Sequence, residues 1–202
     1  MKLMPKPIHQ LLAMKRLIAA ALVTLVASPA LAVDFKTAME HYLEANIMPW
    51  AHEPGIISAI EAQNTLHEGL TGPDIDALDQ QWEREIGAAD APLITSVLTN
   101  SLSDALRGHV EAAAGAVFEL FVMDAHGLNV ASSAQTSDYW QGDEAKFTDT
   151  YGKGAGAVHF GEVEFDESSQ AYQAQISMTI TDPSTGAPIG AITVGINADH
   201  LM

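Results

Sequence analysis

The stretch YQAQISMTITDPSTGAPIGAITVGINAD, residues 172–199, constrains the fold more than any other part of the chain. Apolar and polar residues alternate strictly from Tyr172 to Ile180, which is the pattern of a strand with one buried face. The residues that follow, DPSTG at 182–186, are typical of a hairpin connection. The next run is apolar enough for a central strand. We therefore expect an antiparallel sheet built around this hairpin.

Further strand patterns precede the hairpin. Residues 116–133 and 158–169 contain short apolar runs separated by turn residues. The second of these alternates only if one residue is skipped at Gly161, which indicates a bulge.

Residues 34–114 show helical rather than strand periodicity. Asp34 is expected to cap a first helix, and a second helix is expected over residues 56–67. Asp74 is expected to cap a third helix, and Pro92 to open a long fourth one. The chain is therefore predicted to be one α+β domain, with N-terminal helices followed by an antiparallel sheet of about five strands.

The N-terminus has the pattern of a secretory signal peptide. Basic residues at 15–16 precede an uncharged apolar run that ends in Ala30-Leu31-Ala32. We expect cleavage after Ala32, which leaves residues 33–202 as a single domain, mainly helical over 33–114 and mainly sheet over 115–202. The alternative is a membrane anchor, for which the apolar run is short. Both Met1 and Met14 fit as the first residue.

The expected mature chain is strongly acidic. None of the 26 acidic residues lies in residues 1–32, which hold four of the nine basic residues, so five basic residues remain and the formal net charge is −21. Such a charge excludes nucleic acids and anionic membrane surfaces as partners. It favours solubility in the periplasm or outside the cell.

Composition and motifs predict neither an enzyme nor a metal or cofactor site. The absence of cysteine excludes thiol catalysis and cysteine-ligated metals. Eight histidines are present, but none forms an H-x-x-x-H or H-E-x-x-H motif. The sequence also has no G-x-S-x-G motif for a nucleophilic serine.

Three segments resemble one family in their order and spacing. They are FVMDAHGLNVASS at 121–133, the stretch at 136–151, and DPSTGAPIGAITVGI at 182–196. In these segments the chain resembles the periplasmic PAS-like Cache (PDC) sensor domains, here in a free-standing exported form. The resemblance implies a PAS-like sheet with a ligand over one face. It also implies signal transduction, with a small-molecule ligand and a membrane receptor or kinase as partners.

In such domains the segment between the second and third strands closes over the ligand. Here that segment begins TSDYWQGDEAKF, residues 136–147. Its aromatic rings suit apolar walls or a cage for a cation, and its amide, carboxylate and lysine groups suit a polar ligand. The predicted ligand-binding residues are Tyr139, Trp140, Gln141, Asp143, Lys146 and Tyr151. The alternative is that Ser137 or Asp138 caps a short helix and Trp140 packs into the core.

The expected function is binding of a small organic molecule without catalysis. A zwitterion, an amine or a small organic acid would suit the segment, and the scarcity of basic residues favours the first two. The alternative is a protein-interaction module that has no small ligand. It would form a homodimer through its N-terminal helices or present them to a membrane receptor.

Overall fold

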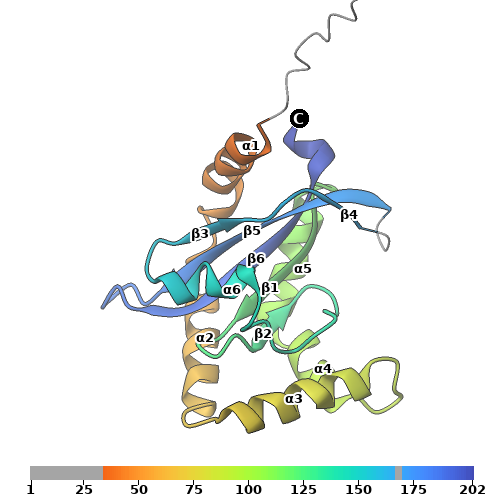
Figure 1. Cartoon of the computed structure of the whole chain (residues 1–202), viewed down its shortest axis with the longest axis vertical. Coiled ribbons are helices and arrows are strands. Elements are labelled where there is room, and N and C mark those ends of the chain that lie inside the picture. The colour runs from red at the N-terminus through yellow and green to blue at the C-terminus, as the bar shows by residue number, and fades with distance from the viewer. Residues whose placement is uncertain (1–33, 167–169) are drawn as a thin grey trace, which may run out of the picture. The chain divides into compact units, whose positions relative to one another are not determined.

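The computed structural model describes residues 34–166 and 170–202, in which helices are followed by one antiparallel sheet (Figure 1). Six strands form this sheet in the order β2-β1-β6-β5-β3, and β4 also pairs with β5. The strands are β1 (Val117–Met123), β2 (Asn129–Ser132), β3 (Val158–Phe160), β4 (Glu164–Asp166), β5 (Ala171–Thr181) and β6 (Pro188–Asn197). The predicted α+β class is confirmed.

The hairpin of β5 and β6 is the longest pairing in the sheet. Its register runs from Gln173 opposite Asn197 to Thr181 opposite Pro188. Strand β6 lies between β5 and β1, which confirms its predicted central place. In the turn, hydrogen bonds from the side chain and backbone of Ser184 and from the Thr185 side chain lower the pKa of Asp182 to about 2.

The predicted slip at Gly161 divides one apolar run into two strands. In β3, Val158 pairs with Met178, whereas in β4, Glu164 pairs with Gln173, so the register shifts by one residue between them. The Gly161 N–H still donates to the Gln175 carbonyl at 2.8 Å. This division explains why the sheet has six strands rather than about five.

Helices α2 (Pro54–Leu66) and α5 (Ser101–Ala112) pack against one face of the sheet. Helix α1 (Phe35–Tyr42) continues as the π-helix η1 (Leu43–Ile47) and joins the same core. As predicted, Asp34 caps α1, because its carboxylate accepts from the Thr37 N–H at 3.4 Å. Fully buried members of this main core include Ile47, Ile56, Ile60, Leu106, Leu120, Ile176, Ile180 and Ile192.

The predicted cap of the third helix is wrong by one turn. Helix α3 (Gly72–Glu85) has Thr71 as its N-cap, and Asp74 is the third helical residue. The Asp74 carboxylate accepts from the Thr71 N–H at 2.9 Å, so the two residues form a reciprocal capping box.

The long helix predicted after Pro92 is two helices, α4 (Pro92–Leu98) and α5. Asn100 separates them, because its side-chain oxygen accepts from the Ser103 N–H at 2.9 Å and caps α5. Its amide also donates to the Val130 carbonyl on β2 at 3.0 Å. This contact with a distant strand fixes the break.

Helices α3 and α4 form a second, separate apolar cluster with the segment that follows β2. Its buried members are Trp82, Ile94, Val97, Leu128 and Tyr139. Three short helical elements complete the described fold: α6 (Ala145–Thr148), η2 (Tyr151–Lys153) and η3 (Ala198–Leu201). Figure 1 shows α6 in front of the sheet and α5 behind it.

The described residues all belong to one compact unit, Val33–Met202. None of the helices in this part of the chain is long and apolar enough to span a membrane. The expected signal peptide lies outside the described residues. Its cleavage, and the division of the chain at Ala32, stay predictions.

Candidate ligand-binding cleft

The sheet face opposite α2 and α5 is polar along β5, because the strand's alternation places its glutamines and hydroxyls there, whereas Phe121, Met123 and Ala191 form a small apolar cluster with Phe147 elsewhere on it. Above this face lies a cleft of about 350 Å³. Strands β1 and β5 form its floor, and the segment after β2 forms its wall. The lining residues are Glu119, Phe121, Gln135, Thr136, Ser137, Gln141, Lys146, Gln173 and Gln175.

Glu119 is the acidic residue of this floor. Its Oε1 accepts from the Gln173 side-chain amide at 3.0 Å and from the Gln175 side-chain amide at 3.3 Å. Among the described residues, no basic nitrogen lies within ion-pair distance of this carboxylate. Two neutral amides therefore hold the carboxylate in place without cancelling its charge.

Gly195 on β6 makes this arrangement possible. It lies opposite both Glu119 and Gln175 in the sheet register. A Cβ atom at Gly195 would lie 2.6 Å from Cγ of Glu119 and 2.8 Å from Nε2 of Gln173. The missing side chain thus leaves the space in which Glu119 and Gln173 meet.

Lys146 reaches the cleft from α6. Its Nζ lies 3.0 Å from Oε2 of Glu144 and donates to the Gln141 side-chain oxygen at 3.1 Å. The same ammonium lies 5.4 Å from the centre of the Phe121 ring. Only 15% of the Lys146 side chain is exposed. Lys146 is one of the predicted ligand-binding residues, and in the structure its charge already has a partner in Glu144.

Of the six predicted site residues, the structure brings Gln141 and Lys146 to the cleft. Tyr139 and Trp140 face the second apolar cluster instead. Tyr139 stacks on Trp82 with ring centres 5.5 Å apart. Its burial, with a further contribution from the Asp124 carboxylate, raises the pKa of its hydroxyl.

Trp140 packs in the way that the alternative interpretation described. Its indole N–H donates to the His126 carbonyl at 2.9 Å. A Cβ at Gly142 would lie 2.2 Å from Nε1 of Trp140, so the backbone there lies directly against the indole ring. The ring therefore holds the end of the β1–β2 hairpin.

The other two predicted residues also lie away from the cleft lining. Asp143 is exposed, and Tyr151 stacks on Phe147 with ring centres 5.0 Å apart. The predicted short helix is present as α6, but Glu144 precedes it as the N-cap residue rather than Ser137 or Asp138. The ligand-binding role of the six residues as a set stays a prediction.

Sequence reasoning missed Glu119, Gln173 and Gln175. A signal for them was present, because Glu119 is the one charged residue in the apolar run AVFELFVM. Both glutamines fall on the polar half of the alternation in β5. An acidic residue on β1 and two amides on β5, on one face with only β6 between the two strands, form a polar floor.

Helix α3 fixes the wall of the cleft. Oδ1 of Asp79 accepts from the backbone N–H groups of Tyr139 and Trp140, both at 2.9 Å. The indole N–H of Trp82 donates to the Thr136 carbonyl at 3.0 Å. The segment is therefore anchored at both ends, while Thr136 and Gln141 line the cleft.

One group of three acidic residues in the described part of the chain has the spacing of metal ligands. Carboxylate oxygens of Asp79, Glu83 and Asp138 lie within 4.8 Å of one another. Asp79 already accepts two backbone hydrogen bonds, and Asp138 accepts from the Ser137 hydroxyl at 2.6 Å. These local hydrogen bonds account for the positions of two of the three carboxylates.

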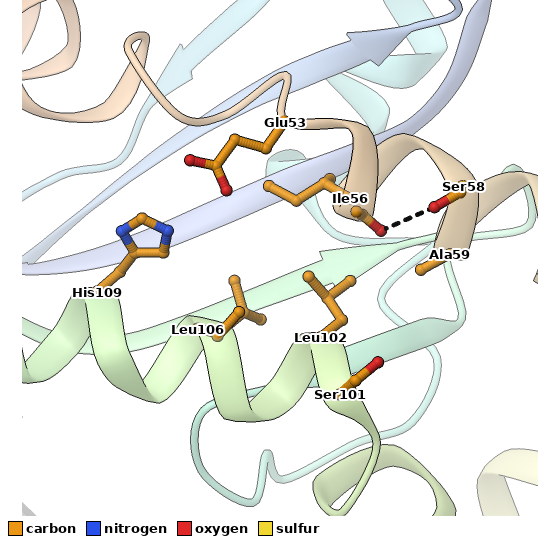
Figure 2. Close-up of a pocket in the computed structure, with 10 residues that line it drawn as sticks. Glu53, Ile56, Ser58, Ala59, Ser101, Leu102, Leu106 and His109 are labelled. Atoms are coloured by element: carbon orange, nitrogen blue, oxygen red, sulfur yellow. Dashed lines mark hydrogen bonds between the residues drawn. The ribbon is translucent and has the colours of Figure 1, made fainter.

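A separate hollow of about 320 Å³ lies between α2 and α5 (Figure 2). Its floor is apolar, with Ile56, Leu102 and Leu106, and Glu53 and His109 stand at one end. The hollow lies on the helical layer, where the alternative interpretation of the sequence placed a homodimer contact. That contact stays a prediction.

No protein-family model matches the sequence, and no curated protein matches it. Solved structures that resemble the chain in fold are sensor or ligand-binding domains. The ligand-binding domain of the Campylobacter jejuni chemoreceptor Tlp3, in complex with 4-methylisoleucine, has a TM-score of 0.40 and 11% identity, and covers 83% of this chain and 61% of that one.

Two further structures are similar to the same degree. The ligand-binding domain of the Pseudomonas aeruginosa PAO1 chemoreceptor PctC, in complex with GABA, has a TM-score of 0.40, 15% identity and coverage of 81% of this chain and 62% of that one. The sensor domain of the V. cholerae histidine kinase DctB has a TM-score of 0.39 and 15% identity, and covers 80% of this chain and 59% of that one. The chain thus spans about three fifths of each of the three domains.

The described fold has helices that lead into an open antiparallel sheet with a central β5–β6 hairpin. Its fold is PAS-like.

Proposed function

We propose that this chain is an exported sensor-type domain that binds a small organic amine in the cleft over the polar sheet face, without chemical change. The observation that carries the proposal is Glu119. It places a carboxylate on the cleft floor, two glutamine amides orient it, and no described basic group neutralises it. Export is proposed from the pattern of residues 14–32, and a membrane receptor or kinase is the proposed partner.

The physical reason is the cost of leaving a charge partly buried. Glu119 has lost part of its hydration, and its two amide donors return only part of that free energy. A ligand ammonium would form a charge-assisted hydrogen bond with the carboxylate, which is about twice as strong as a neutral one. The cleft volume of about 350 Å³ suits a small molecule.

The same geometry ranks the ligand classes that the sequence left open. A zwitterion would place its ammonium on Glu119 and its carboxylate near Thr136 and Ser137. A small organic acid would have to displace Glu144 from Lys146 while it approached Glu119. Amines are therefore favoured over zwitterions, and zwitterions over organic acids.

Calorimetric titration of residues 33–202 with butylamine, 4-aminobutanoate and succinate tests the proposal. We expect butylamine to bind and succinate not to bind. Glu119→Gln should weaken butylamine by about tenfold or more, the size of one charged hydrogen bond. Glu111→Gln, an exposed change on α5, serves as the matched control and should leave the affinity unchanged. Succinate binding, or equal butylamine affinity in Glu119→Gln and in the unaltered protein, would contradict the proposal.

A further inference from the structure

A second hollow adjoins the cleft along the sheet. It has a volume of about 460 Å³ and shares Lys146, Gln173 and Gln175 with the cleft as lining residues. Its other lining residues are Glu144, Gly161, Glu162, Glu164 and Phe165. The two hollows therefore run along the same polar face, with the glutamines of β5 between them.

The charges of this double hollow are separated into two ends. Glu119 stands at one end, and Glu162 and Glu164 stand at the other. No described basic nitrogen lies within ion-pair distance of any of these three carboxylates. In the middle, Lys146 and Glu144 neutralise each other. Each end thus keeps negative charge, and the middle is neutral.

The sheet register shows how far apart the two ends lie. Glu119 is on β1, and Glu164 is on β4, which is reached through β6 and β5. Three strand spacings give roughly 14 Å between the two backbones, and both side chains shorten the distance that a ligand must span. Glu164 is directly opposite Gln173, so both side chains point to the same face.

The two ends are joined by the glutamines that both hollows share as lining residues. Gly195 on β6 has no side chain of its own, and the Glu119 and Gln173 side chains meet above it, while Gly161 adds no side chain beside β5. The Phe121 ring is buried in a small cluster with Phe147, and Phe165 pairs with Tyr172 on the opposite face of the sheet, so neither ring lies between the two ends.

We infer that the ligand is a linear diamine or triamine, which lies across the sheet with one ammonium on Glu119 and another on Glu162 and Glu164. This inference rests on the proposed function and adds a second point of attachment to it. A chain of methylenes between two ammonium groups matches the order of carboxylate, neutral amides and carboxylates along the face. A ligand with a single ammonium group, bound at Glu119, leaves Glu162 and Glu164 without a partner.

The test compares spermidine, 1,4-diaminobutane and butylamine by calorimetric titration of residues 33–202 at fixed ionic strength. We expect spermidine to bind most tightly, with a gain of up to about fivefold for each exposed ion pair added. The double change Glu162→Gln with Glu164→Gln should abolish that gain and leave butylamine unaffected. Glu119→Gln should weaken all three amines.

A matched control separates a built site from general attraction to an acidic protein. Glu61→Gln with Glu111→Gln also removes two exposed carboxylates, from α2 and α5 on the helical side. Equal loss of spermidine affinity in the two double variants would overturn the inference, as would equal binding of spermidine and butylamine by the unaltered protein. Both results leave amine binding at Glu119 intact. If no amine binds at all, the proposed function fails as well.

Discussion

Two carboxylates, Asp124 directly after β1 and Glu119 within it, have opposite surroundings. Asp124 follows the strand and is fully buried, and four donors satisfy it. Its Oδ1 accepts from the N–H groups of His126 and Leu128 at 2.8 and 3.0 Å, and its Oδ2 contacts Gln63 at 3.0 Å and His67 at 2.7 Å. Glu119 has amide donors on one oxygen only. The first carboxylate is therefore suited to stability and the second to binding.

Removal of the Asp124 carboxylate should destabilise the fold. Asp124→Ala leaves two backbone donors, Gln63 and His67 without their acceptor in a buried place, and we expect a loss of about 3 kcal/mol in the free energy of unfolding. Urea denaturation followed by tryptophan fluorescence measures it. Asp143→Ala, a change at an exposed loop residue, is the control and should cost little. Equal stability of the two variants would show that Asp124 has no such role.

At the scale of secondary-structure elements, the helices depend on contacts that are distant in sequence. Glu85 ends α3, is buried, and accepts from the N–H groups of Leu93 and Ile94 at 2.8 and 3.0 Å at the start of α4. Gln81 donates to the same carboxylate at 2.7 Å. Burial acts to raise the pKa of Glu85, but these three hydrogen bonds outweigh it, and the pKa lies below its ordinary value.

This carboxylate should make stability depend on pH. Because the folded-state pKa is lowered, Glu85 contributes stability above its unfolded pKa of about 4.5 and loses that contribution as the pH falls through the lower folded value. We expect Glu85→Gln to be less stable than the unaltered protein at pH 7, with the difference shrinking from pH 5 to pH 3. Denaturation curves at several pH values measure it. A difference that stays constant with pH would contradict this assignment.

The elements were predictable where local pattern decides them. Alternation and turn residues located the β5–β6 hairpin, and a single slip located the bulge at Gly161. The break between α4 and α5 was not predictable, because Asn100 ends one helix through a bond to Val130, 30 residues away. The positions of Tyr139 and Trp140 outside the cleft were not predictable for a similar reason. Trp82 and Asp79 draw Tyr139 and Trp140 away from it, across about 60 residues of chain.

At the scale of the whole molecule, the described residues have three apolar clusters, and the two larger ones have different members. The main core joins α1, α2 and α5 to the sheet, whereas the second cluster joins α3 and α4 to the segment after β2. Local opening that separates α3 from the sheet needs to expose only the second cluster, which buries fewer residues. Its free energy should therefore be lower than that of global unfolding.

Amide hydrogen exchange, resolved by residue, tests this division. The N–H groups of Tyr139 and Trp140 should exchange sooner than that of Val194 in the central strand, because their acceptor Asp79 leaves with α3. Asp79→Ala should speed exchange at Tyr139 and Trp140 at least about tenfold and leave Val194 nearly unchanged. Equal acceleration at all three sites would mean that the molecule opens as one unit.

The two backbone hydrogen bonds to Asp79 also determine how often the cleft wall can move. They join the wall of the cleft to α3, so the wall moves freely only while that helix is detached. The exchange rates of these two amides in the free protein therefore measure how often the cleft wall is released. They set a frequency against which the association rate of any ligand can be compared.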